Sequence, residues 1–191
     1  MPRPRLSTTS VVNAAVGLVD EQGPGALTLA AVARRTGVAT PSLYKHVRSV
    51  EALQQKVSAR VTAELASVLS TAVAGRSGED AVRSLAHAYR DYALSHPGRY
   101  PLTQRVPDAQ DPEHVAASER AVQVVLAALR GYGLSGDEAI HATRVARSVL
   151  HGFVILEIDG GFALPQDVGS SFERCVSALH VSLRNWREVA R

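Results

Sequence analysis

The stretch that decides the fold is TLAAVARRTGVATPSLYKHV, residues 28–47. It predicts two short helices, over 29–36 and 41–47, joined by about four residues that include Gly37. Thr28 is a favourable N-cap for the first helix, and Gly37 can end it because glycine accepts the left-handed backbone conformation. Two short helices joined by a tight turn are typical of a helix-turn-helix, whose second helix enters the major groove of DNA.

The second of these helices is too short to be stable alone, so it must be held by packing. Leu43 and Val47 can supply that packing. We expect Thr40 to cap the helix and Pro41 to occupy its first turn, where the missing N–H does no harm.

The other face of the second helix carries polar groups that suit DNA. Thr40 and Ser42 can hydrogen-bond base edges or phosphates, and Pro41 can contact a thymine methyl group. Tyr44 and Lys45 can reach phosphates. The candidate DNA-binding residues from this reasoning are Thr28, Thr40, Pro41, Ser42, Tyr44, Lys45 and His46, with Arg3 and Arg5 on a tail that could reach the minor groove.

Outward from this segment, apolar residues recur at three-to-four spacing and no strand-like alternation persists, which predicts an all-α fold of about nine helices. The expected helices are 8–21, 29–36, 41–47, 49–73, 79–95, a short one within 99–105, 113–131, 135–159 and 170–188. We expect a helix-turn-helix DNA-binding domain over 1–48 and a helical ligand-binding and dimerisation bundle over 49–191. The helix at about 49–73 connects the two domains.

Charge is distributed unevenly along the chain. Residues 1–60 hold eight Lys or Arg and three acidic residues, a net charge of +5, whereas residues 61–191 hold 13 Arg and 15 acidic residues, a net charge of −2. A basic N-terminal module suggests an anionic partner, most commonly nucleic acid. No apolar run reaches the roughly 18 residues of a membrane span and no signal-type segment follows the basic start, so we expect a cytoplasmic protein without a membrane partner.

From about Val11 to Leu53 the chain resembles the TetR family of repressors, through GPG at 23–25 and above all SLYKHV at 42–47. This resemblance implies three DNA-binding helices and a larger helical domain that dimerises and binds a small molecule. It implies a repressor that binds a palindromic double-stranded DNA operator and is released by an inducer. The chain has Val50 where the family usually has a phosphate-anchoring lysine, so Arg48 is added to the DNA-binding set as its substitute.

The second module resembles the subgroup of this family whose C-terminal domain carries a HisGly motif. The matching segments are LHGFVILEIDGGF at 150–162 and HPGRY at 96–100. The match is informative about the fold and carries little information about the ligand.

Two C-terminal helices have wider apolar faces than one small domain needs, which predicts a four-helix bundle made with a second copy of the chain. The alternative is that both helices are only intramolecular core. The candidate homodimer residues are Val145, Val149, Gly152, Leu156, Phe172, Val176, Leu179, Leu183 and Trp186.

Polar and aromatic residues on the inner helices are candidates for a ligand pocket, because such pockets are mostly apolar with a few polar groups. They are Tyr89, Tyr92, His96, Tyr100, Gln104, Arg147, His151 and Phe153. Each of them taken alone is more often a structural residue, as His151 illustrates. A ligand between the inner helices would move the connecting helix and so change the spacing of the two recognition helices.

Catalysis is not expected. The seven histidines form no metal-ligand pair such as HExxH, no glycine-rich phosphate loop follows a strand, and no serine occupies a nucleophile elbow. We therefore expect no cofactor, no metal and no enzymatic activity. The remaining alternative is a helical ligand-binding or interaction protein that has lost specific DNA binding.

Overall fold

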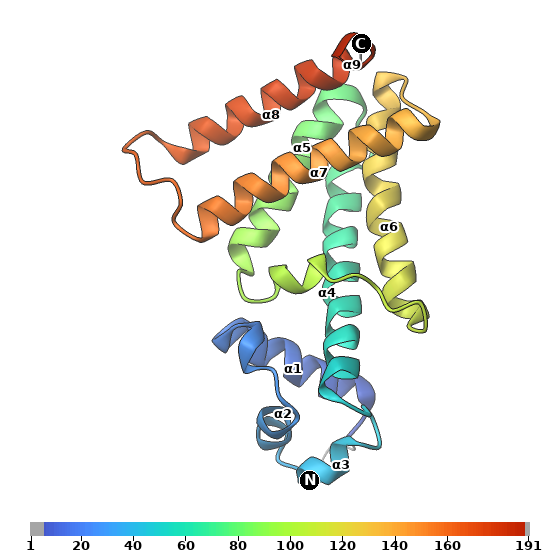
Figure 1. The fold of residues 1–191 in the computed structure, drawn as a ribbon, viewed down its shortest axis with the longest axis vertical. Coiled ribbons are helices and arrows are strands. Elements are labelled where there is room, and N and C mark those ends of the chain that lie inside the picture. The colour runs from blue at the N-terminus through green and yellow to red at the C-terminus, as the bar shows by residue number, and fades with distance from the viewer. Residues whose placement is uncertain (1–5, 190–191) are drawn as a thin grey trace. The chain divides into compact units, whose positions relative to one another are not determined.

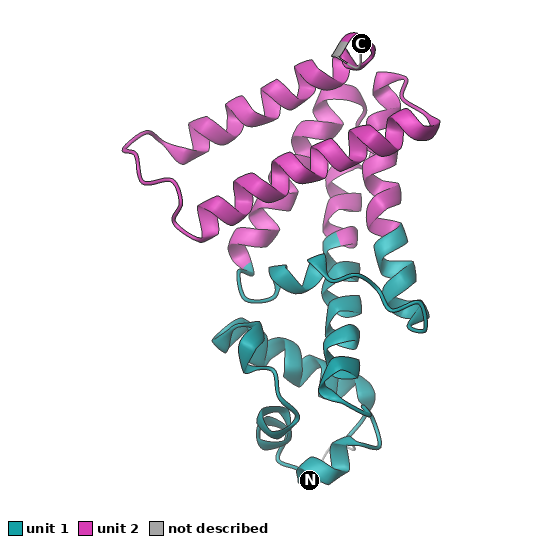
Figure 2. Cartoon of the chain, viewed as in Figure 1, with its two compact units in different colours: residues 1–65, 96–119 teal, residues 66–95, 120–191 magenta. Residues whose placement is uncertain are grey.

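The computed structural model describes residues 6–189, and every regular element in that range is helical. The described chain forms two compact units (Figure 1, Figure 2). Unit 1 contains the residues up to 65 together with 96–119, and unit 2 contains 66–95 together with the residues from 120 onward. The all-α prediction is confirmed.

The element bounds lie close to the expected ones. The α-helices are α1 (Thr8–Gln22), α2 (Leu29–Thr36), α3 (Thr40–Leu43), α4 (Val50–Val73), α5 (Gly78–Ser95), α6 (Pro112–Leu129), α7 (Gly136–Ile158), α8 (Val168–Arg184) and α9 (Trp186–Val189). Short 3-10 helices are η1 (Pro24–Ala26), η2 (Tyr100–Gln104) and η3 (Arg130–Tyr132).

Three details of the prediction were wrong. The residue before α3 is Ala39, which makes no side-chain capping hydrogen bond, so Thr40 is the first helical residue rather than the cap. The helix ends at Leu43 and the chain continues as turns to His46. The last expected helix is interrupted at Asn185, which separates α8 from α9.

Unit 1 is organised around α1. Ser7 and Ser10 form a reciprocal capping box, with the Ser7 hydroxyl accepting from the Ser10 amide at 3.1 Å. The buried face of α1 joins a core that also takes residues from η1, α2, α3, α4 and η2. Arg35 of α2 pairs with Glu21 of α1 at 2.6 Å and so ties the first two helices together.

Unit 2 contains α5, α7 and α8, which contact one another, together with η3 and α9. Its core takes apolar residues from α5, α7 and α8, including Val82, Ala142 and Leu179. Trp186 completes this core and its indole N–H donates to Glu138 of α7 at 2.6 Å. This bond gives the buried indole the polar partner that it needs.

Candidate nucleic-acid interface

The α2–α3 segment is built as a helix-turn-helix. The hydroxyl of Thr28 accepts from the amide of Ala31 at 3.1 Å and starts α2. Gly37 ends α2 in the left-handed conformation, with φ of 69°. Leu43 is fully buried and Val47 is 3% exposed, so these two side chains anchor α3 and the following turns in the core of unit 1. Packing therefore holds a four-residue helix that would not persist alone.

Anchoring one face of α3 leaves its other face exposed. The ring of Tyr44 is 56% exposed, and Pro41 and Lys45 are also exposed, while Ser42 is half-buried. Because the side chains of Tyr44 and Lys45 are exposed, they contribute little to the packing of unit 1. An aromatic ring beside a cation suits contact with an anionic surface. The structure thus brings the predicted residues of 40–46 onto one short segment of unit 1.

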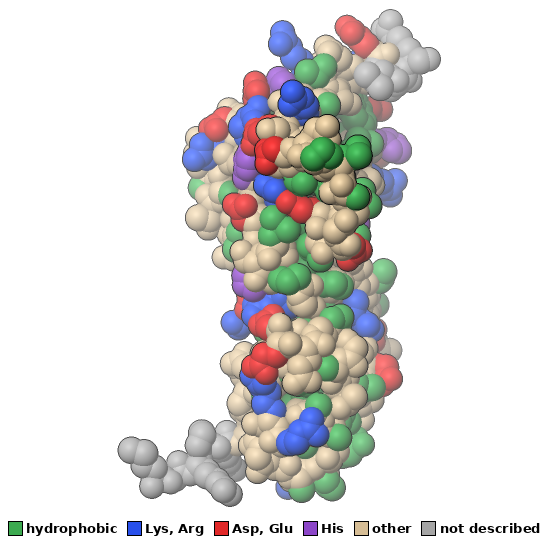
Figure 3. All heavy atoms as spheres, turned by 90° about the vertical axis from the view of Figure 1, so that its left-hand side faces the viewer, with side chains coloured by type: hydrophobic (Ala, Val, Ile, Leu, Met, Phe, Trp, Pro, Cys, Tyr) green, Lys and Arg blue, Asp and Glu red, His purple; other side chains and the backbone are tan. Residues whose placement is uncertain are grey.

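The cations near this segment are mostly unpaired. Lys45, Arg48 and Lys56 make no ion pair with any residue that the structure describes. By contrast, Arg35 pairs with Glu21, and Arg60 pairs with Glu64 at 2.8 Å. Basic side chains are visible on the lower part of the face drawn in Figure 3, which belongs to unit 1. Unpaired cations can bind phosphates without first breaking an ion pair.

The N-terminus of α4 carries an acidic residue that weakens it as a phosphate-binding site. Ser49 accepts from the amide of Ala52 at 3.1 Å, as a helix cap does. Its neighbour Glu51 lies in the first turn of the helix. Hydrogen bonds from its own backbone amide and from Ser49 lower the pKa of the Glu51 carboxyl. Glu51 therefore remains an anion at the helix end that would otherwise attract phosphate.

Two predicted residues, Arg3 and Arg5, lie outside the described part of the chain. Thr28 is exposed and acts as a helix cap, and Arg48 is exposed in the turn before α4.

Sequence reasoning missed that the segment 96–105 belongs to unit 1, where it contacts α1 and α4. Arg99 pairs with Asp20 at the end of α1 and with Glu64 of α4, the latter at 2.8 Å. A Cβ at Gly98 would lie 2.3 Å from the carbonyl oxygen of Val19, so only glycine allows the chain this close to α1. The HPGRY segment was matched to a family subgroup, and its glycine and arginine attach this turn to α1 and α4.

Sequence reasoning also missed the role of His114, which is fully buried and bonded to Gln55. The Nδ1 atom of His114 lies 2.7 Å from Oε1 of Gln55, which joins the start of α6 to α4. The Nε2 atom is buried and has no hydrogen-bond partner among the described residues. Burial lowers the pKa of His114, which keeps its ring neutral. His114 lies where a polar loop meets a helix, so no hydrophobic periodicity in the sequence pointed to its bond with Gln55.

The predicted ligand residues are divided between the units. His96, Tyr100 and Gln104 belong to unit 1, and the other five belong to unit 2. Tyr89, Tyr92 and Tyr100 are buried, Phe153 and His151 are half-buried, and Arg147 is exposed. Burial lowers the pKa of His151.

Within unit 2 the three phenylalanines of the chain gather around Phe153. Its ring centroid lies 4.8 Å from that of Phe162 and 5.2 Å from that of Phe172. The Arg90 guanidinium lies over the Phe172 ring at 4.9 Å and pairs with Glu157, and both members of this ion pair are largely shielded from solvent. Hydrogen bonding to Glu157 raises the pKa of Arg90. This cluster combines aromatic rings with a charged pair at the junction of α5, α7 and α8.

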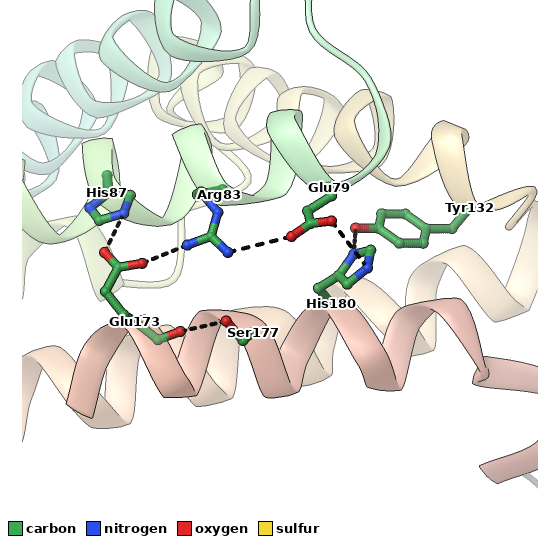
Figure 4. A network of polar contacts seen from close by, with 7 residues as sticks. All are labelled: Glu79, Arg83, His87, Tyr132, Glu173, Ser177 and His180. Atoms are coloured by element: carbon green, nitrogen blue, oxygen red, sulfur yellow. Dashed lines mark hydrogen bonds and ion pairs between the residues drawn. The ribbon is translucent and has the colours of Figure 1, made fainter. Parts of the chain in front are cut away.

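A second polar network joins α8 to α5 (Figure 4). Glu173 of α8 binds Arg83 at 2.5 Å and His87 at 2.9 Å, both on α5. One α5 turn earlier, Glu79 contacts His180 at 3.4 Å, and the ring of His180 is bonded to the hydroxyl of Tyr132 at 2.8 Å. Burial raises the pKa of Tyr132 to about 12, so its hydroxyl stays protonated. These contacts fix α8 against α5.

The predicted dimer residues fall into two groups. Val145, Gly152 and Leu156 lie exposed on α7, and Val149 is half-buried beside them. The five residues of α8 and α9 are instead packed inside unit 2, and they are Phe172, Val176, Leu179, Leu183 and Trp186. The outer face of α8 presents Val181, which is 55% exposed, and Ala178. The buried group can therefore support a dimer only by holding α8 in place.

No described helix is long and apolar enough to cross a membrane. Among the described residues, no group of three or more His, Cys, Asp or Glu is arranged to hold a metal ion.

Comparison with known proteins agrees with this geometry. Residues 11–57 match the family model described as bacterial regulatory proteins, tetR family, and residues 82–179 match the model described as Tetracyclin repressor-like, C-terminal domain. The chain is 43% identical over 157 residues to an uncharacterized HTH-type transcriptional regulator of Mycobacterium tuberculosis, covering 82% of this chain and 72% of that protein. It is 33% identical to the uncharacterized HTH-type transcriptional regulator YobS of Bacillus subtilis, covering 87% of each.

Among solved structures, a TetR variant from Acinetobacter baumannii in complex with minocycline superimposes with a TM-score of 0.73 at 19% identity. The superposition covers 96% of this chain and 99% of that chain, and it supports the fold. The curated relatives are named regulators of transcription and not enzymes, as the sequence predicted.

Proposed function

Since this chain belongs to the TetR family of DNA-binding transcriptional regulators, we propose that it is a repressor that binds a near-palindromic operator as a homodimer. A small-molecule inducer bound by unit 2 releases it. It acts in the cytoplasm, where bacterial DNA is accessible.

The observation that carries the proposal is the exposed, cationic face of the α3 segment. Tyr44 and Lys45 are exposed in the turn that follows α3, directly after the buried Leu43 that anchors this segment. In the proposed complex Pro41 and Ser42 contact base edges, and Tyr44, Lys45 and Arg48 contact phosphates. Arg48 takes the role of the phosphate-anchoring lysine that the family usually has at the position of Val50. Glu51 reduces the attraction of the N-terminus of α4 for phosphate.

Dimerisation uses the exposed face of α7 around Gly152. This face carries Val145 and Leu156, which are 39% and 49% exposed, and α8 adds Val181. A glycine between apolar side chains allows two helices to approach closely. A dimer is needed because two recognition helices must lie about one DNA turn apart, roughly 34 Å, to bind both halves of a palindrome.

The inducer is proposed to bind unit 2 near the aromatic cluster of Phe153, Phe162 and Phe172. Flat apolar walls with one charged pair, here Arg90 and Glu157, are typical of small-molecule sites. The A. baumannii TetR variant, which has the same fold, is complexed with minocycline. Of the predicted ligand residues, those in unit 2 stay a proposal for the walls of this site: Tyr89, Tyr92, Arg147 and His151. His96, Tyr100 and Gln104 belong to unit 1 and stay a prediction by themselves.

The test is fluorescence anisotropy on DNA from upstream of the gene and its neighbours, with a shuffled duplex as the control and several salt concentrations. We expect specific binding at least about 10³-fold tighter than binding to the control, at two protomers per site. Tyr44→Ala and Lys45→Ala should each weaken binding at least ten-fold, and Lys45→Ala should lower the salt slope by about 0.9. Arg130→Ala, an exposed cation of unit 2, is the matched control and should change neither.

The alternative is an interaction protein without specific DNA binding, and Val50 with the ionised Glu51 is the observation that favours it. Equal, weak binding to all upstream fragments and to the control, unaffected by Lys45→Ala, would support this alternative and contradict the repressor.

A further inference from the structure

Unit 1 contains a cavity of about 560 Å³ between the start of α4 and the loop that leads into α6. One wall carries the cations Arg48 and Lys56, together with His46 and Glu51. The opposite wall belongs to the loop and its junction with α6, and it carries three carboxylates, those of Asp108, Asp111 and Glu113. We call these three residues the acidic wall.

The charges on the two walls do not neutralise one another by contact. Arg48 and Lys56 make no ion pair with a described residue, and the same holds for the three carboxylates of the acidic wall. The negative charge therefore remains available to act at a distance. Phosphates brought to Arg48 and Lys56 would approach the three carboxylates across this cavity. Charges within about one Debye length of each other, roughly 8–10 Å, still interact in salt solution.

Two of the three carboxylates of the acidic wall accept hydrogen bonds from backbone amides. The Asp108 carboxylate accepts from the amide of Gln110 at 2.9 Å, and the Asp111 carboxylate accepts from the amide of His114 at 3.2 Å. The buried ring of His114 is in turn bonded to Gln55, which also lines the cavity. The bond between His114 and Gln55 therefore joins the Asp111 end of the loop to α4 and keeps the Asp111 carboxylate beside the cavity.

We propose that the acidic wall is an intramolecular electrostatic brake on DNA binding, which opposes the attraction of phosphates to Arg48 and Lys56. The inference rests on the proposed function, because it needs DNA at the α3 segment. The brake acts on charge alone, so it lowers affinity for all DNA sequences by a similar factor and leaves the preference between sequences unchanged.

Its size follows from Coulomb's law. In water at about 10 Å, one carboxylate–phosphate repulsion corresponds to roughly a two-fold change in Kd. Three carboxylates acting independently give about eight-fold without screening, and about three-fold at 50 mM salt, where the Debye length is about 14 Å. The effect should fall to about two-fold or less at 0.5 M salt, where the Debye length is only a few ångströms.

The test compares the wild type with the variant Asp108→Asn, Asp111→Asn, Glu113→Gln on a generic 30-base-pair duplex at 50 mM and 500 mM NaCl. Asparagine and glutamine keep the shapes and the hydrogen-bond acceptors of the acids, and asparagine is as good a helix cap as aspartate. We expect binding about three-fold tighter at 50 mM and little changed at 500 mM. The melting temperature reports whether the variant is folded.

The matched control removes three exposed acids of unit 2, as Asp91→Asn, Asp137→Asn, Asp159→Asn, with the same change in net charge. It should bind DNA within about two-fold of the wild type. If both variants bind DNA more tightly by the same factor, the effect is one of overall charge. If the variant of the acidic wall binds no more tightly than the wild type, the wall has no influence. Either result overturns the brake. A charge-preserving variant, Asp108→Glu, Asp111→Glu, Glu113→Asp, should behave as the wild type.

The wild type on generic and upstream DNA is measured first. If it binds neither, the proposed function fails. If it binds and the neutralised variant binds equally well, only the brake fails.

Discussion

Gly152 offers a test in which protomer stability and dimer affinity change in opposite directions. It lies in the middle of α7, and a Cβ added there would meet no heavy atom of the protomer within 4 Å. Glycine in a helix interior costs about 0.5–1 kcal/mol relative to good helix formers. Gly152→Gln should therefore stabilise an isolated protomer by about this amount, which raises its melting temperature by roughly 2–4 °C.

The dimer should respond oppositely. If α7 faces its copy through Gly152, the larger side chain overpacks the interface at both symmetry-related positions. Overpacking costs about 1–3 kcal/mol at each position. Since 1.4 kcal/mol is a ten-fold change in Kd, the dimer dissociation constant should rise at least about 30-fold.

Sedimentation velocity over a concentration series measures the dimer constant, and thermal unfolding at low concentration measures the protomer. Ala127→Gln introduces the same side chain at an exposed position of α6 and should leave dimerisation unchanged. A Gly152→Gln protein that is as dimeric as the wild type at every concentration would refute the placement of α7 in the interface. Operator affinity should fall together with dimerisation, because a single protomer contacts only one half-site.

Three further changes test the construction of unit 1. Thr28→Ala removes the cap of α2 and should cost about 1 kcal/mol, or roughly 2–4 °C in thermal unfolding. Gly98→Ala should destabilise the protein by about 1–3 kcal/mol, measured by denaturant titration, because its Cβ would collide with the carbonyl of Val19. Gly25→Ala is the control and should cost far less in the same titration, because the space around Gly25 is open. Burial holds the pKa of His114 below its ordinary 6.5, so the unfolded chain binds the proton first and stability should fall as pH drops below about 6.5. His114→Gln should flatten that dependence in melts between pH 7.5 and pH 5.5, and an unchanged slope would contradict the argument.

The helices were predictable because their signals are local. Caps such as Thr28, stops such as Gly37, and apolar residues at three-to-four spacing act within one or two turns. The recognition segment was predictable for the same reason, since its exposed and anchored residues alternate within seven positions. Thr40 was misplaced by one position because a polar residue before a proline suits both a cap and a first turn.

What the sequence could not supply was the partner of each long-range contact. Arg99 reaches residues 79 and 35 positions away, and the pairing of His114 with Gln55 spans 59 positions. The burial of Phe172 against α5 and α7 was equally hidden, because an apolar helix face has the same pattern whether its own chain or a second copy covers it. The dimer set predicted for α8 shows this ambiguity directly.

The contacts of Arg99 and Gly98 change how an inducer signal could reach DNA. The chain passes directly from Ser95, the last residue of α5 in unit 2, into a turn that touches the end of α1 through Gly98 and both α1 and α4 through Arg99. The same segment continues through η2 to the acidic wall. If an inducer displaced the end of α5, this covalently continuous segment would carry the displacement to α1 and α4. It would also carry it toward the acidic wall proposed to oppose phosphate binding. A signal along this route needs no large movement of α4, since a small shift of charged groups near the phosphates is enough to change affinity several-fold.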